Sequence, residues 1–241
     1  PGRWVLNLAL AQRSHAGIDA RLVMQVPGAS RDFRTEMEGV PVHFVAAPDR
    51  FRSMTLFVPD ALRLRRAVMA EAPDLIHAHG TEDAYALTAL ACGLPSIVTA
   101  QGCFFIINRE LPPGIISRER VVQFTEWLAL KNTKHAIAKS AYVRDELKKA
   151  FPHLELHEVP NTIDPRLLDI SVGGMREPGS LAFVGTVVPR KGVHLLIEAL
   201  ELLKAGEPGF FGRLKLHVFG DRPQASSGYE IECKSRLEAL L

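Results

Sequence analysis

Hydrophobic positions along the chain switch repeatedly between the two-residue period of strands and the roughly 3.6-residue period of helices. Short apolar runs that predict strands cover residues 19–26, 40–48, 74–80, 95–102, 135–140 and 154–161. Amphipathic patterns that predict helices cover residues 1–17, 59–73, 82–93, 117–132 and 142–151. Strands that alternate with helices in this way are typical of β-α-β units, whose parallel sheet is covered on both faces.

A second series of the same kind begins near residue 180. Residues 180–185 and 213–221 predict strands, and helices are expected from about residue 191 and from about residue 227. The stretch between the two series, residues 165–179, holds two prolines and three glycines and is typical of a linker. We therefore expect an α/β chain with one Rossmann-like domain over residues 1–164 and the start of another over residues 180–241.

Both ends of the chain predict a fragment. Residue 1 already lies in the turn before a helix, although a parallel sheet of this kind normally starts on a strand. The second series contains two strands, which are too few for a stable independent sheet. We expect the first strand and most of the second domain to be missing, and the chain alone to be inactive.

Composition narrows the class of protein only slightly. Hydrophobic residues make up 47% and charged residues 23% of the chain, as in ordinary globular proteins, and the net charge of +2 does not predict nucleic-acid binding. The three cysteines, Cys92, Cys103 and Cys233, show no paired spacing, which indicates a reducing compartment. No apolar run reaches transmembrane length and no signal-peptide pattern is present. A cytoplasmic location is the expectation.

Candidate chemistry lies directly after the predicted strands, because ligands of open parallel sheets bind beyond the carboxyl ends of the strands. The clearest case is residues 185–192, where two glycines and the adjacent cations Arg190 and Lys191 precede a helix. Free backbone N–H groups and fixed positive charge there predict an anion site. The alternative is a pair of solvated cations at a helix start. The other stretches to inspect are residues 77–80, 99–102, 160–164 and 220–221.

Six stretches, in this order, resemble the GT-B-fold glycosyltransferases of family 4, also called group 1. They are PDLIHAHG, GLPSIVTAQG, AIAKSAYVRDEL, VPNTID, FVGTVVPRKGVHLLIEAL and LHVFGD. The resemblance implies two Rossmann-like domains facing a cleft, with the acceptor bound by the N-terminal domain and a nucleotide-activated sugar by the C-terminal one. It also implies transfer with retention at the anomeric carbon, without a metal ion or a cofactor.

The resemblance assigns the donor side to the second domain. Lys191 matches a family lysine that binds the donor diphosphate, and Gly185, Thr186 and Arg190 surround it in the sequence. The family usually has an arginine where this chain has Thr186, so Arg190 is a candidate for the second positive charge. Gly220 and Asp221 are expected on the nucleotide side.

Gln101 lies where the family commonly has a histidine close to the transferred sugar. Glutamine donates and accepts hydrogen bonds but cannot take a proton, so Gln101 is expected to hold a sugar hydroxyl or to stabilise charge at the anomeric centre. Lys191 and Gln101 are thus the catalytic candidates. The expected acceptor or cleft residues are His79, Gly80, Gly102, Asn161 and Asp164.

Simpler interpretations stand beside these assignments. His77 and His79 point to one face of a strand, and the simpler interpretation is a packed pair. The alternative is the start of a metal site, which would need further ligands at later strand ends, and the other histidines do not lie at such positions. Asn161 and Asp164 are also favoured by plain turn chemistry. The cluster Arg63, Arg65 and Arg66 is either a solvated helix face or, as in many relatives, a peripheral membrane contact at the inner face of the membrane.

The leading interpretation is a metal-independent retaining glycosyltransferase. It would move a sugar from a UDP- or GDP-sugar to a saccharide or lipid-linked acceptor, in glycan, polysaccharide or glycolipid synthesis. The alternatives are a nucleotide-sugar epimerase of the same fold and a non-catalytic nucleotide- or glycan-binding relative. The family carries an E-x7-E pair beyond the position of residue 241, and that pair would separate these classes. The sequence does not name the sugar, the acceptor or the oligomeric state.

Overall fold

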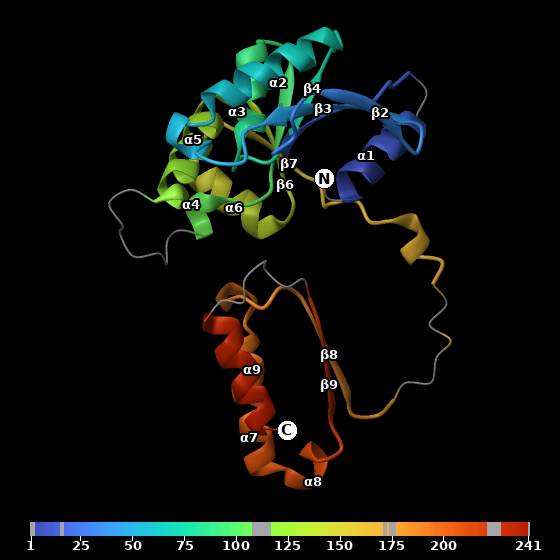
Figure 1. Cartoon of the computed structure of the whole chain (residues 1–241), viewed down its shortest axis with the longest axis vertical. Coiled ribbons are helices and arrows are strands. Elements are labelled where there is room, and N and C mark those ends of the chain that lie inside the picture. The colour runs from blue at the N-terminus through green and yellow to red at the C-terminus, as the bar shows by residue number, and fades with distance from the viewer. Residues whose placement is uncertain are drawn as a thin grey trace. The chain divides into compact units, whose positions relative to one another are not determined.

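The computed structural model, described over residues 3–14, 17–107, 117–170, 173, 177–220 and 228–240, divides into two units. The first unit is Pro1–Ile170 and the second is Ser171–Leu241 (Figure 1). Each unit alternates strands with helices, which confirms the predicted α/β class. No helix among the described residues is long and apolar enough to cross a membrane.

The helices and strands of the first unit follow the predicted order. Its helices are α1 (Arg3–Ser14), α2 (Val58–Ala70), α3 (Ala84–Cys92), α4 (Phe104–Ile107), α5 (Arg118–Asn132) and α6 (Ala141–Ala150). Its strands are β1 (Leu22–Pro27), β2 (Phe33–Met37), β3 (Val40–Ala47), β4 (Ile76–His79), β5 (Ser96–Ala100), β6 (His135–Ala138) and β7 (Glu155–Glu158). Short 3₁₀ turns form at Ser53–Thr55 (η1) and Pro165–Leu167 (η3).

The strands of the first unit form two hydrogen-bonded sheets. Strands β4, β5, β6 and β7 pair side by side in parallel, as the pattern predicts. The other sheet has the order β1-β3-β2, and β2 runs antiparallel to β3. Strand β2 was not expected from the sequence, so the expectation of purely parallel pairing was wrong at this edge. A tight turn makes the hairpin, because Glu38 and Gly39 both adopt positive φ, 51° and 83°.

Helices cover both faces of the β1-β3-β2 sheet. Val40 of β3 packs with Leu6 and Ala9 of α1. Val45, five residues later and therefore on the opposite face, packs with residues of α2 such as Leu64. Alternate residues of one strand thus build two separate cores, which is the arrangement expected for a Rossmann-like layer.

The β4–β7 sheet is apolar on one face, whereas its other face mixes polar side chains with Ile97 and Ile137. Ala78, Val98, Ala100 and Ala136 are buried against α3, α5 and α6. The intervening residues of these strands carry histidine and threonine side chains, at His77, His79 and Thr99. The carboxyl ends of these strands, with the loops that follow them, position the candidate site.

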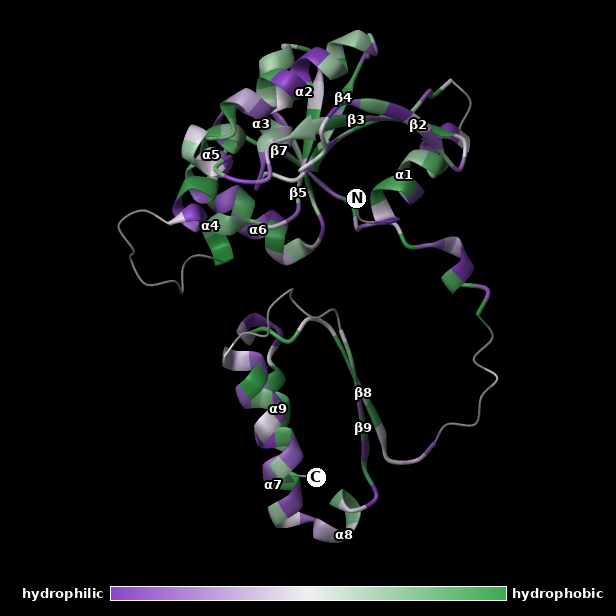
Figure 2. Ribbon diagram, viewed as in Figure 1, coloured by the Kyte–Doolittle hydropathy of each residue, from purple (hydrophilic) through white to green (hydrophobic). Residues whose placement is uncertain are grey.

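The second unit pairs β8 (Ser180–Val184) with β9 (Lys215–Phe219) in parallel. Its helices are α7 (Val193–Gly206), α8 (Pro208–Phe211) and α9 (Gly228–Leu240), and a 3₁₀ turn, η4 (Pro189–Lys191), precedes α7. Hydrophobic and hydrophilic residues alternate along these helices (Figure 2), and the apolar ones, such as Ile197 and Leu200, form the core of the unit. Val184 on β8 is 79% exposed, so this sheet also presents apolar side chains to solvent.

Candidate functional site

Two of the predicted cleft glycines, Gly80 and Gly102, lie on either side of the Glu82 side chain. Gly80 follows β4 with a φ of +104°, and a Cβ there would lie 3.0 Å from Glu82 Oε2. A Cβ on Gly102, after β5, would lie 3.1 Å from the Phe104 ring and 3.6 Å from Glu82 Cδ. The Thr81 amide donates to Glu82 Oε2 at 2.8 Å. Glycine is therefore favoured at position 80 by its positive φ and at position 102 by the tight approach of the Phe104 ring, and the Glu82 side chain lies near both strand ends.

Gln101 lies at the centre of a polar row formed by the loops after β5, β6 and β7. Its carbonyl oxygen accepts a hydrogen bond from Lys139 Nζ at 2.8 Å, and its side-chain Nε2 donates to Asn161 Oδ1 at 3.4 Å. The structure thus brings the predicted residues Gln101 and Asn161 together. Its half-exposed amide, with a neighbouring cation, can hydrogen-bond a hydroxylated ligand, and it offers no group that takes a proton.

A buried carboxylate fixes the loops around this row. Glu126 of α5 is completely buried and accepts hydrogen bonds from Thr81 Oγ1 at 2.6 Å and from the Phe105 amide at 2.8 Å. Burial raises the pKa of the Glu126 carboxyl above its ordinary value, although both hydrogen bonds oppose that shift. Glu126 therefore ties the strand ends of β4 and β5 to one helix. Sequence reasoning missed it because nothing local distinguishes it from a surface glutamate.

The histidine pair on β4 is packed inside the unit. His77 Nε2 shares a 2.7 Å hydrogen bond with Thr99 Oγ1, and the His77 and His79 ring centroids lie 3.9 Å apart. The Trp4 ring meets His79 edge-on at 5.0 Å. Burial lowers the pKa of His77 to about 4 and that of His79 to about 3, so both rings are neutral near pH 7. The simpler of the two interpretations, a packed pair, describes these contacts.

Acid should destabilise the first unit through these histidines. Unfolding returns each pKa to its ordinary value of about 6.5, so stability falls as the pH drops below about 6.5, by roughly 2 kcal/mol per histidine at about pH 5. His79→Phe keeps an aromatic ring without the titration. We expect its free energy of unfolding in urea to change less between about pH 7.5 and about pH 5 than that of the parent. The exposed His157→Phe is the control, and an unaltered pH dependence in His79→Phe would contradict the assignment.

Asp164 is held by arginines. Its carboxylate accepts hydrogen bonds from Arg166 at 2.5 and 2.9 Å, and Arg3 lies 3.5 Å away. The Arg166 hydrogen bond holds the pKa of Asp164 well below its usual range. Asp164 also accepts from the Arg166 amide and so caps the 3₁₀ turn η3. Its observed contacts are those of turn chemistry and an ion pair, and they do not join it to Gln101.

A second polar cluster, centred on Arg52, fixes the loop after β3. Arg52 donates to Asp60 Oδ2 at 3.0 Å, to Asp83 Oδ1 at 2.8 Å and to Gln25 Oε1 at 2.5 Å. Asp60, in the first turn of α2, is only 2% exposed. The cluster joins β1, α2 and the start of α3 to the loop. No local pattern predicts this cluster, because its members lie far apart along the chain.

In the second unit the structure brings together the predicted donor-side glycines, Gly185 and Gly220. The Gly185 amide donates to the Phe219 carbonyl at 2.8 Å, and a Cβ on Gly220 would lie 2.3 Å from the Gly185 carbonyl oxygen. Only glycine fits at position 220 without moving the backbone. Asp221, the other predicted nucleotide-side residue, lies outside the described residues.

Lys191 extends from η4 past Gly185. Its Cδ would lie 3.9 Å from a Cβ built on that glycine, while the Lys191 and Arg190 residues are exposed. The turn is closed by hydrogen bonds from the Val188 amide to the Thr186 carbonyl and from the Lys191 amide to the Val188 carbonyl. The stem of an exposed lysine therefore lies beside a glycine, where no side chain limits access to the backbone. The His194 amide, in the first turn of α7, already donates a hydrogen bond to the Tyr229 hydroxyl oxygen at 3.1 Å.

Comparisons with known proteins show the family and the fold of the chain. The sequence profile described as Glycosyltransferase Family 4 matches residues 1–167. No curated protein sequence matches the chain. Three solved structures are similar in fold at low sequence identity, and their likeness confirms the predicted GT-B architecture.

The first of these structures is an E. coli protein described as "Trehalose-6-phosphate", bound with UDP-2-fluoro glucose. It has a TM-score of 0.68 and 11% identity, over 100% of this chain and 66% of its own. Sucrose-phosphate synthase from Thermosynechococcus elongatus has a TM-score of 0.69 and 17% identity, over 99% of this chain and 60% of its own. The trehalose-phosphate synthase of Burkholderia xenovorans in complex with glucose-6-phosphate has a TM-score of 0.55 and 11% identity, over 92% of this chain and 70% of its own. The chain thus spans less than two thirds of the first two proteins.

Proposed function

Because this chain belongs to Glycosyltransferase Family 4, we propose that it is part of an enzyme that transfers a sugar from a nucleotide-diphosphate sugar to an acceptor hydroxyl. The observation that carries the proposal is the exposed Lys191, whose aliphatic stem lies beside Gly185 at the carboxyl end of a strand in a chain of this family. The donor is a UDP- or GDP-sugar. The acceptor is a saccharide or a lipid-linked saccharide.

The chemistry needs positive charge more than it needs a base. When the bond between the anomeric carbon and the phosphate oxygen breaks, negative charge grows on the leaving diphosphate. Lys191 supplies a fixed cation for that charge, and the exposed Arg190 is placed to add a second, in a role that requires neither a metal ion nor a cofactor. Gln101 holds the sugar through its amide. We propose that the product keeps the anomeric configuration of the donor.

Product stereochemistry tests this proposal. The full-length enzyme is incubated with an α-linked donor and its acceptor, and the anomeric proton of the first-formed product is recorded by NMR. An α-linked product is expected, and a β-linked product would overturn the retaining mechanism while leaving glycosyl transfer intact.

A second candidate, a non-catalytic relative that binds nucleotides or glycans, is favoured by Thr186 and Gln101, which stand where the family usually has an arginine and a histidine. Turnover distinguishes these functions from each other and from an epimerase. A transferase releases nucleoside diphosphate only when an acceptor is present, whereas a binding protein retains the donor unchanged and an epimerase converts the donor sugar without any acceptor.

Gln101 is expected to bind sugar without moving protons. Gln101→Ala removes one or two hydrogen bonds to the substrate and should lower kcat/KM roughly ten- to a hundredfold. Gln101→His restores the group usual in the family and should retain activity near that of the parent. The pH dependence of kcat/KM in the parent should show no ionisation that Gln101→Ala removes. A folded but inactive Gln101→His would count against the assignment.

A further inference from the structure

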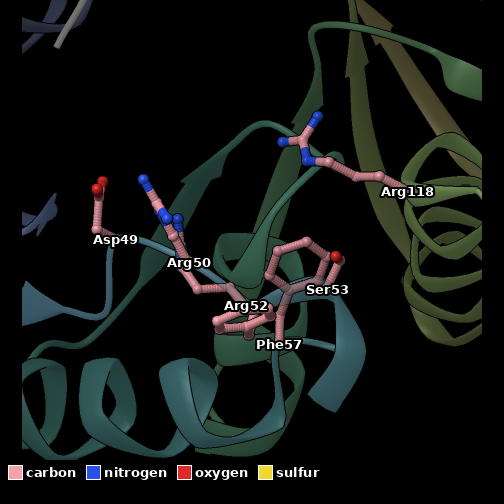
Figure 3. A pocket seen from close by; sticks show the side chains of 7 residues that line it. Asp49, Arg50, Arg52, Ser53, Phe57 and Arg118 are labelled. Atoms are coloured by element: carbon pink, nitrogen blue, oxygen red, sulfur yellow. The ribbon is translucent and has the colours of Figure 1, made fainter.

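An arginine-lined pocket of about 390 Å³ opens at the carboxyl end of β3, apart from the Gln101 row. It is formed by the loop after β3, by η1 and by the first residue of α5 (Figure 3). In Figure 3, Arg50 and Arg118 extend from these different elements toward the same opening, with the Phe57 ring and Ser53 at its wall. The lining residues are Asp49, Arg50, Phe51, Arg52, Ser53, Phe57 and Arg118.

Two of the three arginines in this pocket have charge to offer a ligand. Arg52 is already neutralised by Asp60 and Asp83. Among the described residues, Arg50 and Arg118 form no hydrogen bond or ion pair through their guanidinium groups, and both are exposed. Asp49 on the rim is the one carboxylate in the lining. Within the described ranges, the pocket therefore presents two guanidinium groups that have no hydrogen-bonded partner, beside a wall that carries the Ser53 hydroxyl. Glu119, the neighbour of Arg118 on α5, interacts electrostatically with that arginine.

The surroundings strengthen the positive field. A neighbouring hollow of about 500 Å³ shares Asp49 and is lined by Arg31, Arg63 and Arg66, together with Asp32. Asp32 is engaged, since its Oδ1 accepts the Ala46 amide at 2.8 Å. Arginines thus outnumber carboxylates around the end of β3, and an anion approaching this face is attracted.

The loop that carries the pocket is held in an unusual conformation. Phe51, Leu56 and Phe57 adopt positive φ values of 63°, 51° and 58°, which bulky residues rarely do. Phe57 is buried, and the Arg52 side chain lies over its ring at 5.6 Å. Strained backbone that the surrounding structure maintains is found preferentially at ligand sites, because it presents fixed groups to the ligand.

We propose that the pocket of Arg50 and Arg118 binds a phosphate group carried by the acceptor. The planar guanidinium groups match phosphate oxygens in geometry and charge, and the Ser53 hydroxyl can donate a further hydrogen bond. That the ligand is the acceptor rests on the proposed function. It places an anionic anchor on the acceptor unit and so restricts the acceptor to phosphate-bearing molecules.

Binding to the full-length protein, measured by calorimetry without any donor, tests the proposal. Glucose 6-phosphate and inorganic phosphate are expected to bind, and glucose to bind far more weakly. Arg50→Gln and Arg118→Gln should each weaken phosphate binding about tenfold, because each removes charge-assisted hydrogen bonds. Arg120→Gln, the same change two residues along α5 and outside the pocket, should leave binding unchanged. Thermal melting confirms that the three variants remain folded.

A second arm identifies the source of the phosphate. Co-sedimentation with phosphatidylcholine vesicles, with and without phosphatidic acid, reports whether a lipid-borne phosphate is bound through the same two arginines. Binding of either source that depends on Arg50 and Arg118 supports the phosphate site. Absence of binding in both arms, or binding indifferent to both substitutions, overturns it. Phosphate binding without any sugar transfer would refute the proposed function alone.

Discussion

Replacing Lys191 with alanine is expected to slow sugar transfer by about 10²–10³-fold, because one preorganised charge on the leaving diphosphate stabilises the transition state by roughly 3–4 kcal/mol. The side chain is exposed and lies over Gly185, so its loss removes charge without opening a core. The measurement is kcat/KM of the full-length enzyme with a nucleotide-sugar donor. Circular dichroism and thermal melting of Lys191→Ala should match the parent.

Three further variants show whether the effect belongs to this position. Lys191→Arg keeps the charge and should recover part of the rate. Arg190→Ala should slow transfer less than Lys191→Ala if Arg190 supplies a secondary charge. Lys234→Ala, which removes an exposed lysine from α9 of the same unit, should leave the rate unchanged. Turnover of Lys191→Ala equal to that of the parent would remove Lys191 from the donor site.

Arg52→Ala is expected to destabilise the first unit by about 3–5 kcal/mol, because it leaves a buried carboxylate without its counter-ion. Asp60 is 2% exposed and has its ion pair with Arg52, which also binds Asp83. Since the free energy of unfolding of globular proteins is only about 5–15 kcal/mol, this loss would remove a large part of the stability of the unit. The midpoint of urea unfolding measures it.

Two comparisons isolate the buried charge as the cause. Asp60→Asn combined with Arg52→Ala removes the orphaned charge and should recover part of the lost stability. Arg144→Ala removes exposed ion pairs with Asp145 and Glu158 and should hardly move the midpoint. An Arg52→Ala midpoint equal to that of the parent would show that the cluster does not hold the loop after β3.

The order of helices and strands could be predicted because each has a strong local pattern. Ala136 and Ala138 alternate with half-buried residues on β6, and Leu130 continues the apolar stripe of α5. Strand β2 could not be predicted in the same way. It is an exposed edge strand in which Met37 alone is partly buried, and its Glu38-Gly39 turn lacks the asparagine or aspartate that usually marks a tight hairpin.

The candidate site was predictable where backbone geometry demands a residue type. Glycine at position 220 follows from the close approach of two strand ends and glycine at position 185 from its φ of +154°, and both were predicted as site residues. Glu82, Lys139 and the Arg52 cluster were missed because their partners come from distant segments. Arg52 meets Gln25 and Asp83, which are 27 and 31 residues away. Such contacts depend on tertiary structure, and charge alone does not reveal them.

The most direct test of the central claim is a transfer assay on the full-length enzyme. UDP- and GDP-sugars are supplied with phosphorylated and unphosphorylated saccharide acceptors. Mass spectrometry then compares the amount of nucleoside diphosphate released with the amount of glycosylated product formed. If the protein is a nucleotide-sugar glycosyltransferase, nucleoside diphosphate is released only when an acceptor is present, in an amount equal to the glycosylated product. The release is expected to fall strongly in Lys191→Ala. Conversion of the donor sugar without an acceptor, or donor binding with no product from any pair, would contradict the account.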